Sequence, residues 1–410
     1  MKFFICALIL AVYGLFKFKQ TKVLYPSIIF SGMWAFSFFL IFLARLGMII
    51  SESDIDYMFT YAEPYCVCFT VVSVCSFLLA HRGNKTIVND LIDKKSLEIL
   101  LKNYRWLMYL TFAFGIARIA MFASSFDIDN LTDYRQTFIE SSLSGILGWV
   151  FRIGNWILLF ADVYLVLLGF YHGKTRMIFG DVVLSFVLFS PMLMSTGGRL
   201  FIVYYSLFYF VSFFLGRACA KHKQFLDSSE KRYFIIVVST LIVMVSVYQI
   251  IKIGDQLSSN IDTYLSKYLY VTDGIMSLNW CMEAFGQDLQ LDYGTNSFGF
   301  EKGHNLIIYR NLYQDQVGAA VYSILLPLYL DFGYYGSLIV WFCIAFIFEK
   351  IAIWNLKNIT IIKLLVVLVV SKIEYESVIF NSFNTNYPFV ELVFLLYVFR
   401  HNIFGLFYKR

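Results

Sequence analysis

Five arginines are the side chains of this sequence best suited to binding an anion: Arg118, Arg135, Arg152, Arg199 and Arg310. A guanidinium group stays charged at physiological pH and pairs with phosphate oxygens through two parallel hydrogen bonds. Arg118 and Arg152 lie in apolar runs, where arginine is retained only if it faces a cavity, a partner or a headgroup. Arg199 follows Gly197 and Gly198 at the start of another apolar run. These residues predict a diphosphate-binding face; the alternative is that each arginine pairs with a nearby acid or a lipid headgroup.

Three further side chains could act as a general base. His304 lies in the segment Glu301-Lys302-Gly303-His304-Asn305, and Glu301 and Asp315 offer carboxylates close by. A base within hydrogen-bonding reach of a hydroxyl group can accept its proton as that hydroxyl attacks. The competing interpretation is that His304 is a solvated loop residue, because a single histidine in a loop is more often that.

Signatures of metal and nucleotide binding are weak in this sequence. The pairs Asp54/Asp56 and Asp127/Asp129 could hold a hard cation, but two such pairs among 28 acidic residues are weak evidence, and we assign no metal site. The sequence contains no P-loop, dinucleotide fingerprint, H-E-x-x-H or G-x-S-x-G motif. We therefore expect no cofactor.

The composition indicates that lipid is the solvent of the elements that position these residues. Of the 410 residues, 59% are hydrophobic and 15% are charged, whereas about 25% are charged in an ordinary soluble domain. Such a composition excludes disordered, collagen-like, disulfide-scaffold and nucleic-acid-binding classes. It predicts a polytopic membrane protein.

Apolar runs bounded by charged residues predict about 11 transmembrane helices and hence an all-α fold. The predicted spans are Phe3 to Phe16, Leu24 to Leu43, Tyr65 to Ala80, Trp106 to Ala123, Ile146 to Phe170, Met177 to Met194, Leu200 to Leu215, Tyr233 to Ile251, Tyr334 to Trp354, Ile361 to Val378 and Phe389 to Phe404. Most of the 33 lysines and arginines fall on one side if the N-terminus is outside, and basic loops stay in the cytoplasm. The C-terminus is then cytoplasmic.

This topology divides the chain into three parts. Residues 1–251 carry spans one to eight with short loops, residues 252–333 form a large outer loop, and residues 334–410 carry spans nine to eleven and the cytoplasmic C-terminus. Within the loop, the apolar run from Val317 to Leu330, interrupted by Pro327, is too short to span and is predicted to be re-entrant or interfacial. Long loops of this kind commonly carry function.

The large outer loop is rich in aromatic residues that could stack on sugar rings; an interfacial aromatic belt is the competing interpretation. These residues are Tyr264, Tyr268, Tyr270, Trp280, Phe285, Tyr293, Phe298, Phe300, Tyr309, Tyr313 and Tyr322. An enzyme acting at this face needs an energy source available outside the cytoplasm, and nucleotide sugars are not available there. A lipid-diphosphate donor meets this requirement, because its leaving group carries the free energy and arginines can stabilise the charge that develops.

The chain resembles the oligosaccharide repeat-unit polymerases, the Wzy-type O-antigen polymerases. The resemblance rests on the turn Gly197-Gly198-Arg199, on the long outer loop in the C-terminal third, and on the stretch 322–336 with the sequence YSILLPLYLDFGYYG. It implies that a growing glycan moves from one undecaprenyl diphosphate to the non-reducing end of another lipid-linked repeat unit, at the periplasmic face of the bacterial inner membrane. It also implies functional outer-loop arginines, at Arg199, Arg135 and Arg310.

The expected partners follow from this resemblance. They are the undecaprenyl-diphosphate-linked oligosaccharide, membrane lipids, and a chain-length regulator and a flippase as candidate protein partners, with no nucleic acid. Two other functions fit part of the pattern: an O-antigen ligase, which would use the same donor, and a lipid-linked oligosaccharide flippase. A flippase needs a charged path across the membrane, and the deep ionisable residues of this sequence are few, with Asp162 the clearest.

A pair of substitutions tests the predicted role of Arg199. Arg199→Ala should abolish glycan chain growth in cells, and Arg199→Lys should largely do so, because the point charge of lysine does not reproduce the bidentate geometry of guanidinium. The readout is the length distribution of the surface polysaccharide on a gel. Normal chains in both variants would contradict a role in binding the diphosphate.

Overall fold

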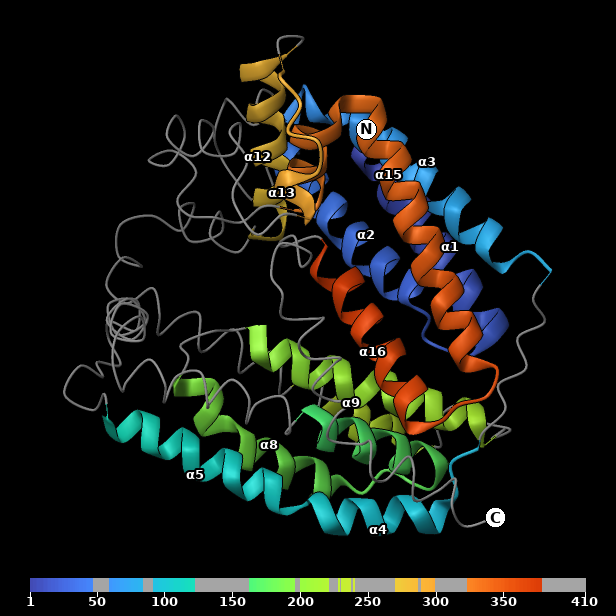
Figure 1. Ribbon diagram of the computed structural model, residues 1–410, viewed down its shortest axis with the longest axis vertical. Coiled ribbons are helices and arrows are strands. Elements are labelled where there is room, and N and C mark those ends of the chain that lie inside the picture. The colour runs from blue at the N-terminus through green and yellow to red at the C-terminus, as the bar shows by residue number, and fades with distance from the viewer. Residues whose placement is uncertain are drawn as a thin grey trace. The chain divides into compact units, whose positions relative to one another are not determined.

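The structure is a computed structural model that describes residues 1–46, 59–83, 91–121, 162–195, 200–220, 228, 230–236, 239, 270–286, 289–298 and 323–377. The described residues are mainly helical and include no β-strand, which confirms the predicted all-α class. The helices with defined bounds are α1 Lys2–Thr21, α2 Pro26–Arg45, α3 Ala62–His81, α4 Lys94–Tyr104, α5 Trp106–Met121, α8 Phe179–Ser195, α9 Leu200–Cys219, α12 Tyr270–Phe285, α13 Thr295–Phe298, α15 Leu325–Leu356 and α16 Ile361–Glu376 (Figure 1).

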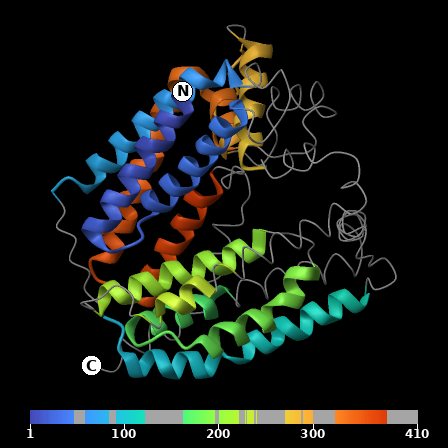
Figure 2. The same cartoon turned by 180° about the vertical axis from the view of Figure 1, so that it is seen from behind.

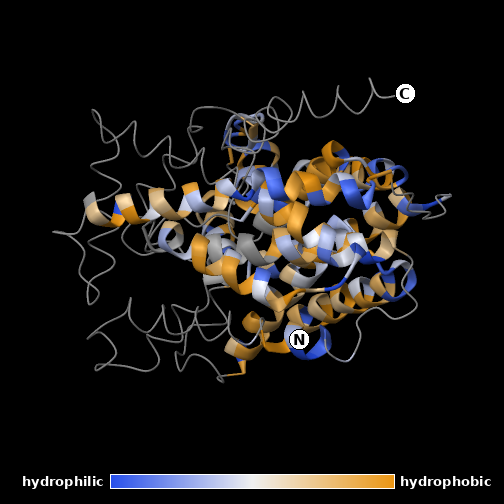
Figure 3. Cartoon of the chain, turned by 90° about the horizontal axis from the view of Figure 1, so that it is seen from below, coloured by the Kyte–Doolittle hydropathy of each residue, from blue (hydrophilic) through white to orange (hydrophobic). Residues whose placement is uncertain are grey.

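Four of these helices, α1, α2, α3 and α15, are long and apolar enough to cross a membrane. Many of their aliphatic side chains face outward, including Leu15, Val71, Leu78, Ile339 and Ile347. Figure 3 shows hydrophobic residues predominating along the helices. Outward-facing aliphatic residues in such numbers fit a lipid environment, and the chain is accordingly treated as a multi-pass membrane protein. The full count of about 11 spans and the outer loop stay predictions.

The chain divides into two compact units. Unit 1 comprises Met1–Ile87, Asn260–Lys357 and Val366–Arg410, and unit 2 comprises Val88–Ser259 and Asn358–Leu365. Unit 1 thus joins the first helices of the chain to segments more than 200 residues later. Each unit is described separately below.

Helices α1, α2, α3 and α15 pack side by side in unit 1 (Figures 1 and 2). Arg45 at the end of α2 donates a 2.9 Å hydrogen bond to Glu63 at the start of α3. At the other end of the helices, Glu349 of α15 contacts both Ser27, near the start of α2, and His81, the last residue of α3. Helix α2 therefore runs antiparallel to α3 and α15, as expected of consecutive spans that alternate in direction.

Aromatic rings fill the core of unit 1. The rings of Phe30 and Trp341 stack with centroids 5.3 Å apart, and those of Trp34 and Phe69 are tilted at 4.8 Å. Each buried indole N–H also has a hydroxyl partner, since Trp341 donates to Ser73 at 2.8 Å and Trp34 donates to a serine of the segment after α16 at 3.0 Å. Serine hydroxyls between helices satisfy polar groups that lipid cannot.

Glycines allow close helix crossings in unit 2. Helical residues 162–174 contain Gly169 and Gly173 one turn apart, a small-x-x-x-small spacing, and both pack against the backbone of α9. A methyl group on Gly173 would overlap the carbonyl oxygen of Phe213, and one on Gly169 would overlap that of Tyr209. In the same unit, Gly115 of α5 brings that helix against the backbone of α8 beside Pro191.

A glycine-to-alanine substitution tests the crossing between residues 162–174 and α9. Gly173→Ala should lower the free energy of unfolding by about 1–3 kcal/mol, because the new methyl group overlaps backbone that cannot move cheaply. The measurement is equilibrium unfolding of the purified protein in detergent. Gly32→Ala is the matched control, since Gly32 lies in α2 with nothing within 4 Å and alanine there favours the helix by up to about 1 kcal/mol. Equal stability of the two variants would contradict the close crossing.

Candidate functional site

Arg118 is the predicted site residue that falls within the described part of the chain. The other predicted site residues lie outside it: Arg135, Arg152, Arg199 and Arg310, the candidate bases Glu301, His304 and Asp315, and the pairs Asp54/Asp56 and Asp127/Asp129. Their roles stay predictions. The described residues nevertheless define how part of the large loop is held against the helices.

Arg118 lies in the last turn of α5 and is 1% exposed, so its side chain points into unit 2. One guanidinium nitrogen is 3.6 Å from the sulfur of Met192 in α8, and the guanidinium carbon lies 5.6 Å from the ring centroid of Phe114. Gly115, one turn earlier on the same face, makes this close approach to α8 possible. The fixed positive charge is therefore held between two helices by soft, polarisable neighbours.

Asp331 anchors a segment of the predicted outer loop to α15. Its buried carboxylate accepts hydrogen bonds from the backbone N–H of Asn296 at 3.0 Å, from the side-chain amide of Asn296 at 3.0 Å and from the backbone N–H of Ser297 at 2.6 Å. Asn296 also donates to Asp292 at 2.7 Å. A carboxylate that accepts several N–H groups is well compensated in a buried place. The acid therefore fixes α13 beside the beginning of α15 (Figure 1).

Backbone pairing extends this anchor. The N–H of Asp292 donates to Leu330 O at 3.2 Å, and the N–H of Tyr293 donates to Asp331 O at 3.1 Å. Two residues later α15 breaks at Gly333, whose φ of 68° and ψ of −170° are open to glycine and costly for other residues. The residues of α15 before Gly333 thus bond to the loop segment, and the residues after Gly333 form the long apolar part of α15.

Helix α12 fastens another part of the same loop to the helix ends. The side-chain oxygen of Asn279 accepts from the N–H groups of Tyr61 at 2.7 Å and Ala62 at 3.0 Å, and so caps the start of α3. Gly274 lies directly against Ser323, whose hydroxyl donates to the Gly274 carbonyl at 3.2 Å. Burial raises the pKa of the Cys281 thiol well above its ordinary value, so this group stays protonated and is a poor nucleophile.

Exposed tyrosines flank the anchored segment. Tyr293 is 81% exposed and Tyr335, just after the break at Gly333, is 78% exposed. Phe298 is partly exposed, with its ring 6.4 Å from that of Phe332. Exposed rings held on an ordered backbone can stack on the apolar face of a sugar, and the tyrosine hydroxyls can hydrogen-bond to it. We name Tyr293, Phe298 and Tyr335 the aromatic rim.

Ion pairs link helix ends near the beginning of α3. Glu63 accepts from Arg45 and lies 3.7 Å from the ammonium group of Lys2, so that two cations share one carboxylate. The guanidinium of Arg45 also lies over the ring of Phe3, with its carbon 5.1 Å from the centroid. These contacts join the beginnings of α1 and α3 to the end of α2.

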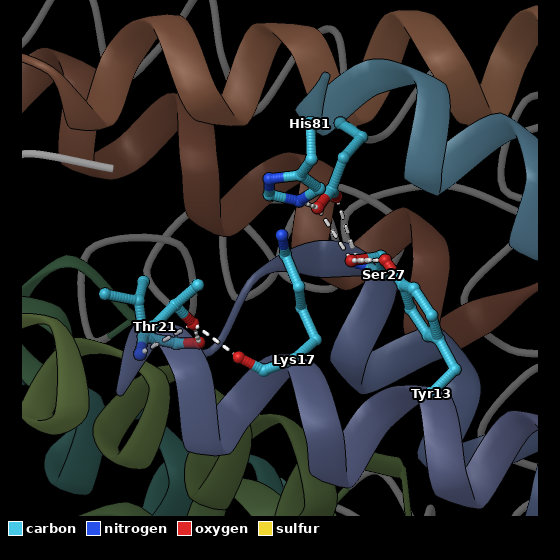
Figure 4. A network of polar contacts seen from close by, with 7 residues as sticks. Tyr13, Lys17, Thr21, Ser27 and His81 are labelled. Carbon is cyan, nitrogen blue, oxygen red and sulfur yellow. Dashed lines mark hydrogen bonds and ion pairs between the residues drawn. The ribbon is translucent and has the colours of Figure 1, made fainter. Parts of the chain in front are cut away.

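Sequence reasoning missed the two buried acids that organise unit 1. Asp331 belongs to the stretch that carries the family resemblance, but it was assigned no role; an acid in an apolar run directly before a Phe-Gly pair is the signal that could have found it. The second acid is Glu349, in contact with His81 and Ser27 at the opposite helix ends (Figure 4). His81 directly follows the predicted span Tyr65 to Ala80, and no local motif marks it.

Comparisons of this chain with protein-family models, with curated proteins and with solved structures found no match.

Removing the carboxylate of Asp331 should release the loop segment. In Asp331→Ala, backbone donors of Asn296 and Ser297 lose their buried acceptor, at a cost of about 1–3 kcal/mol. Amide hydrogen exchange in residues 289–298 should then become about tenfold faster or more. Glu283→Ala in α12 is the control, because Glu283 takes no part in the hydrogen bonds that hold the segment among the described residues. Unchanged exchange in Asp331→Ala would contradict the anchoring role.

Proposed function

We propose that this chain is a polysaccharide polymerase of the Wzy type, a membrane glycosyltransferase. It transfers a growing glycan from undecaprenyl diphosphate to the non-reducing end of another lipid-linked repeat unit. The proposed setting is the periplasmic face of a bacterial inner membrane, with the N-terminus periplasmic and the C-terminus cytoplasmic. The partners in this proposal are the lipid-linked oligosaccharide, membrane lipids, a chain-length regulator and a flippase.

The observation that carries the proposal is the anchored loop segment with its aromatic rim at one end of apolar helices. The proposed substrate has an acyl tail that needs lipid, a diphosphate at the membrane surface and a glycan beyond it. Apolar helices suit the first part, and exposed Tyr293 and Tyr335 suit the third. The predicted arginines are assigned to the second part. The apolar helices and the exposed tyrosines lie together on unit 1, which supports the proposal.

The proposed chemistry is attack by an acceptor hydroxyl on the anomeric carbon of the donor. The new bond joins the hydroxyl oxygen to that carbon, the bond from carbon to the diphosphate oxygen breaks, and undecaprenyl diphosphate leaves with the electron pair. The hydroxyl proton passes to a base, for which His304, Glu301 and Asp315 are the candidates. Arg199, Arg310, Arg135 and Arg152 are the proposed cations for the leaving diphosphate.

Arg118 enters the proposal differently from the other arginines. Its burial between α5 and α8 keeps its charge away from water. Attraction to an anion is strongest where water is excluded. It suits a diphosphate that approaches from within unit 2. The same burial also suits a role confined to holding α5 against α8.

Transport of a lipid-linked unit is the second candidate function. A flippase needs ionisable groups inside the apolar helices, and the structure has more of them than the sequence suggested: Lys17, His81, Glu349 and Glu374 are all buried in unit 1. An O-antigen ligase is an alternative within the enzyme class, since it would share the donor and differ in the acceptor.

A deletion strain distinguishes these functions. Loss of the gene should leave lipopolysaccharide capped with a single repeat unit, because export continues while polymerisation stops, and the wild-type chain should restore the long ladder on a gel. Complete loss of capped lipopolysaccharide would instead indicate a flippase or a ligase and would contradict the polymerase.

The same strain tests the aromatic rim with matched variants. Complementation by Tyr335→Ala should give shorter chains, whereas Tyr335→Phe should restore most of the length, because stacking needs the ring rather than the hydroxyl. Tyr109→Ala is the control, since Tyr109 is a half-exposed tyrosine of α5 in unit 2. Equal chain lengths for the two alanine variants would remove the rim from the site.

A further inference from the structure

Exposed basic and aromatic side chains meet where α4 ends and α5 begins, two helices of unit 2 that follow one another directly in the chain (Figure 1). Lys102 in the last turn of α4 and Arg105 between the helices are exposed, and Trp106, the first residue of α5, is 56% exposed. Ile99, three residues before Lys102, is also exposed. The backbone of Arg105 is itself helical, so residues three or four positions apart share one side across the junction. We name Ile99, Lys102, Arg105 and Trp106 the junction face.

The other side of α4 is packed against unit 2. Leu97 is fully buried, and the hydroxyl of Tyr171 donates a 2.9 Å hydrogen bond to Glu98. The ammonium group of Lys174 donates to the carbonyl of Ile92, just before α4. Both contacts come from the helical residues 162–174. They hold α4 by one side and leave the junction face outward.

The two cations of the junction face form no ion pair with an acid in the part of the chain that the structure describes. The acid within α4, Glu98, lies 3.8 Å from the ammonium group of Lys94 and already accepts from Tyr171. Lys102 and Arg105 can therefore both be used by an anion from outside the chain, and a guanidinium group can bind a phosphate through two parallel hydrogen bonds.

The position of the junction face indicates which anion this is. The predicted span Trp106 to Ala123 begins here, and its exposed aliphatic residues include Leu110 and Ile116. Tryptophan is enriched at the boundary between hydrocarbon and headgroups, where lysine keeps its stem on apolar surface and its charge among the headgroups. Lys102 lies about 6 Å from Trp106 along the axis, at a rise of about 1.5 Å per residue. That is within the Debye length of about 8 Å, over which an anionic membrane surface attracts cations.

We propose that the junction face binds the headgroup of an anionic phospholipid. The guanidinium of Arg105 pairs with the phosphate, Lys102 supplies a second positive charge, and the indole N–H of Trp106 donates to an oxygen at the level of the glycerol. The acyl chains lie along the exposed aliphatic residues of α5. This inference is independent of the proposed polymerase, because it concerns unit 2 and a lipid of the membrane itself rather than the glycan-carrying substrate.

Binding of defined lipids to the purified full chain in detergent tests the proposal. Native mass spectrometry measures the affinity for phosphatidylglycerol and for phosphatidylcholine with the same acyl chains. Phosphatidylglycerol should bind more tightly, and Lys102→Gln/Arg105→Gln should weaken its binding about tenfold or more, because each cation near an anionic headgroup contributes about a fivefold gain in affinity. Equal affinities for the two lipids, or an unchanged affinity in the double variant, would overturn the proposal.

A matched single substitution in the same helix separates a site from general attraction by positive charge. Lys95 is exposed two turns before Lys102 on the same side of α4, but it lies about 16 Å from Trp106 along the axis. Lys102→Gln should weaken phosphatidylglycerol binding about fivefold, whereas Lys95→Gln should change it less than about twofold. Equal losses in the two variants would show attraction by net charge alone and would contradict a site at the junction.

A charge-conserving variant separates loss of binding from loss of folding. Lys102→Arg keeps the charge at the same exposed position and should bind phosphatidylglycerol with nearly wild-type affinity. A loss as large as that of Lys102→Gln would show that the charge is not what binds the headgroup, and would contradict the proposal.

Discussion

The structure of unit 1 depends on the cost of placing polar groups where water cannot reach them. A donor, acceptor or charge that lacks a partner inside an apolar bundle destabilises the fold, and the packing of its apolar neighbours does not offset this cost. The chain therefore supplies partners from distant segments: Asp331 accepts from Asn296 and Ser297, and Glu349 accepts from Ser27. Each of these acids joins separate parts of the sequence, and together they set which helices are neighbours.

The two acids give the two ends of unit 1 different properties. Near Asp331, the loop segment and α12 are fixed so that tyrosines remain exposed around an ordered backbone, which suits recognition of a substrate that extends beyond the membrane. Near Glu349, by contrast, the polar groups face inward and include both His81 and Lys17. The exposed tyrosines and the buried polar network thus lie at opposite ends of α3 and α15.

Much of the fold could be predicted from the sequence because apolar periodicity is local information. The runs that predicted the first three spans and the ninth span coincide with α1, α2, α3 and most of α15. The organising contacts could not be predicted, because His81 and Glu349 are 268 residues apart and neither has a local motif. Arg118 was singled out from its cost in an apolar run, and its role as a site residue stays a prediction. Its neighbour Met192 could not be predicted, because it is set by the close crossing at Gly115, a property of backbone geometry. The candidate bases Glu301, His304 and Asp315 lie outside the described residues.

The most direct measurement of the central claim uses the purified chain in liposomes with one defined substrate, an undecaprenyl-diphosphate-linked repeat unit. Products are separated by size, and free undecaprenyl diphosphate is quantified. Polymerisation predicts a ladder of longer lipid-linked glycans, with one undecaprenyl diphosphate released for each bond formed and no nucleotide added. Unchanged repeat units that move from one leaflet to the other would contradict this account and would identify the protein as a transporter.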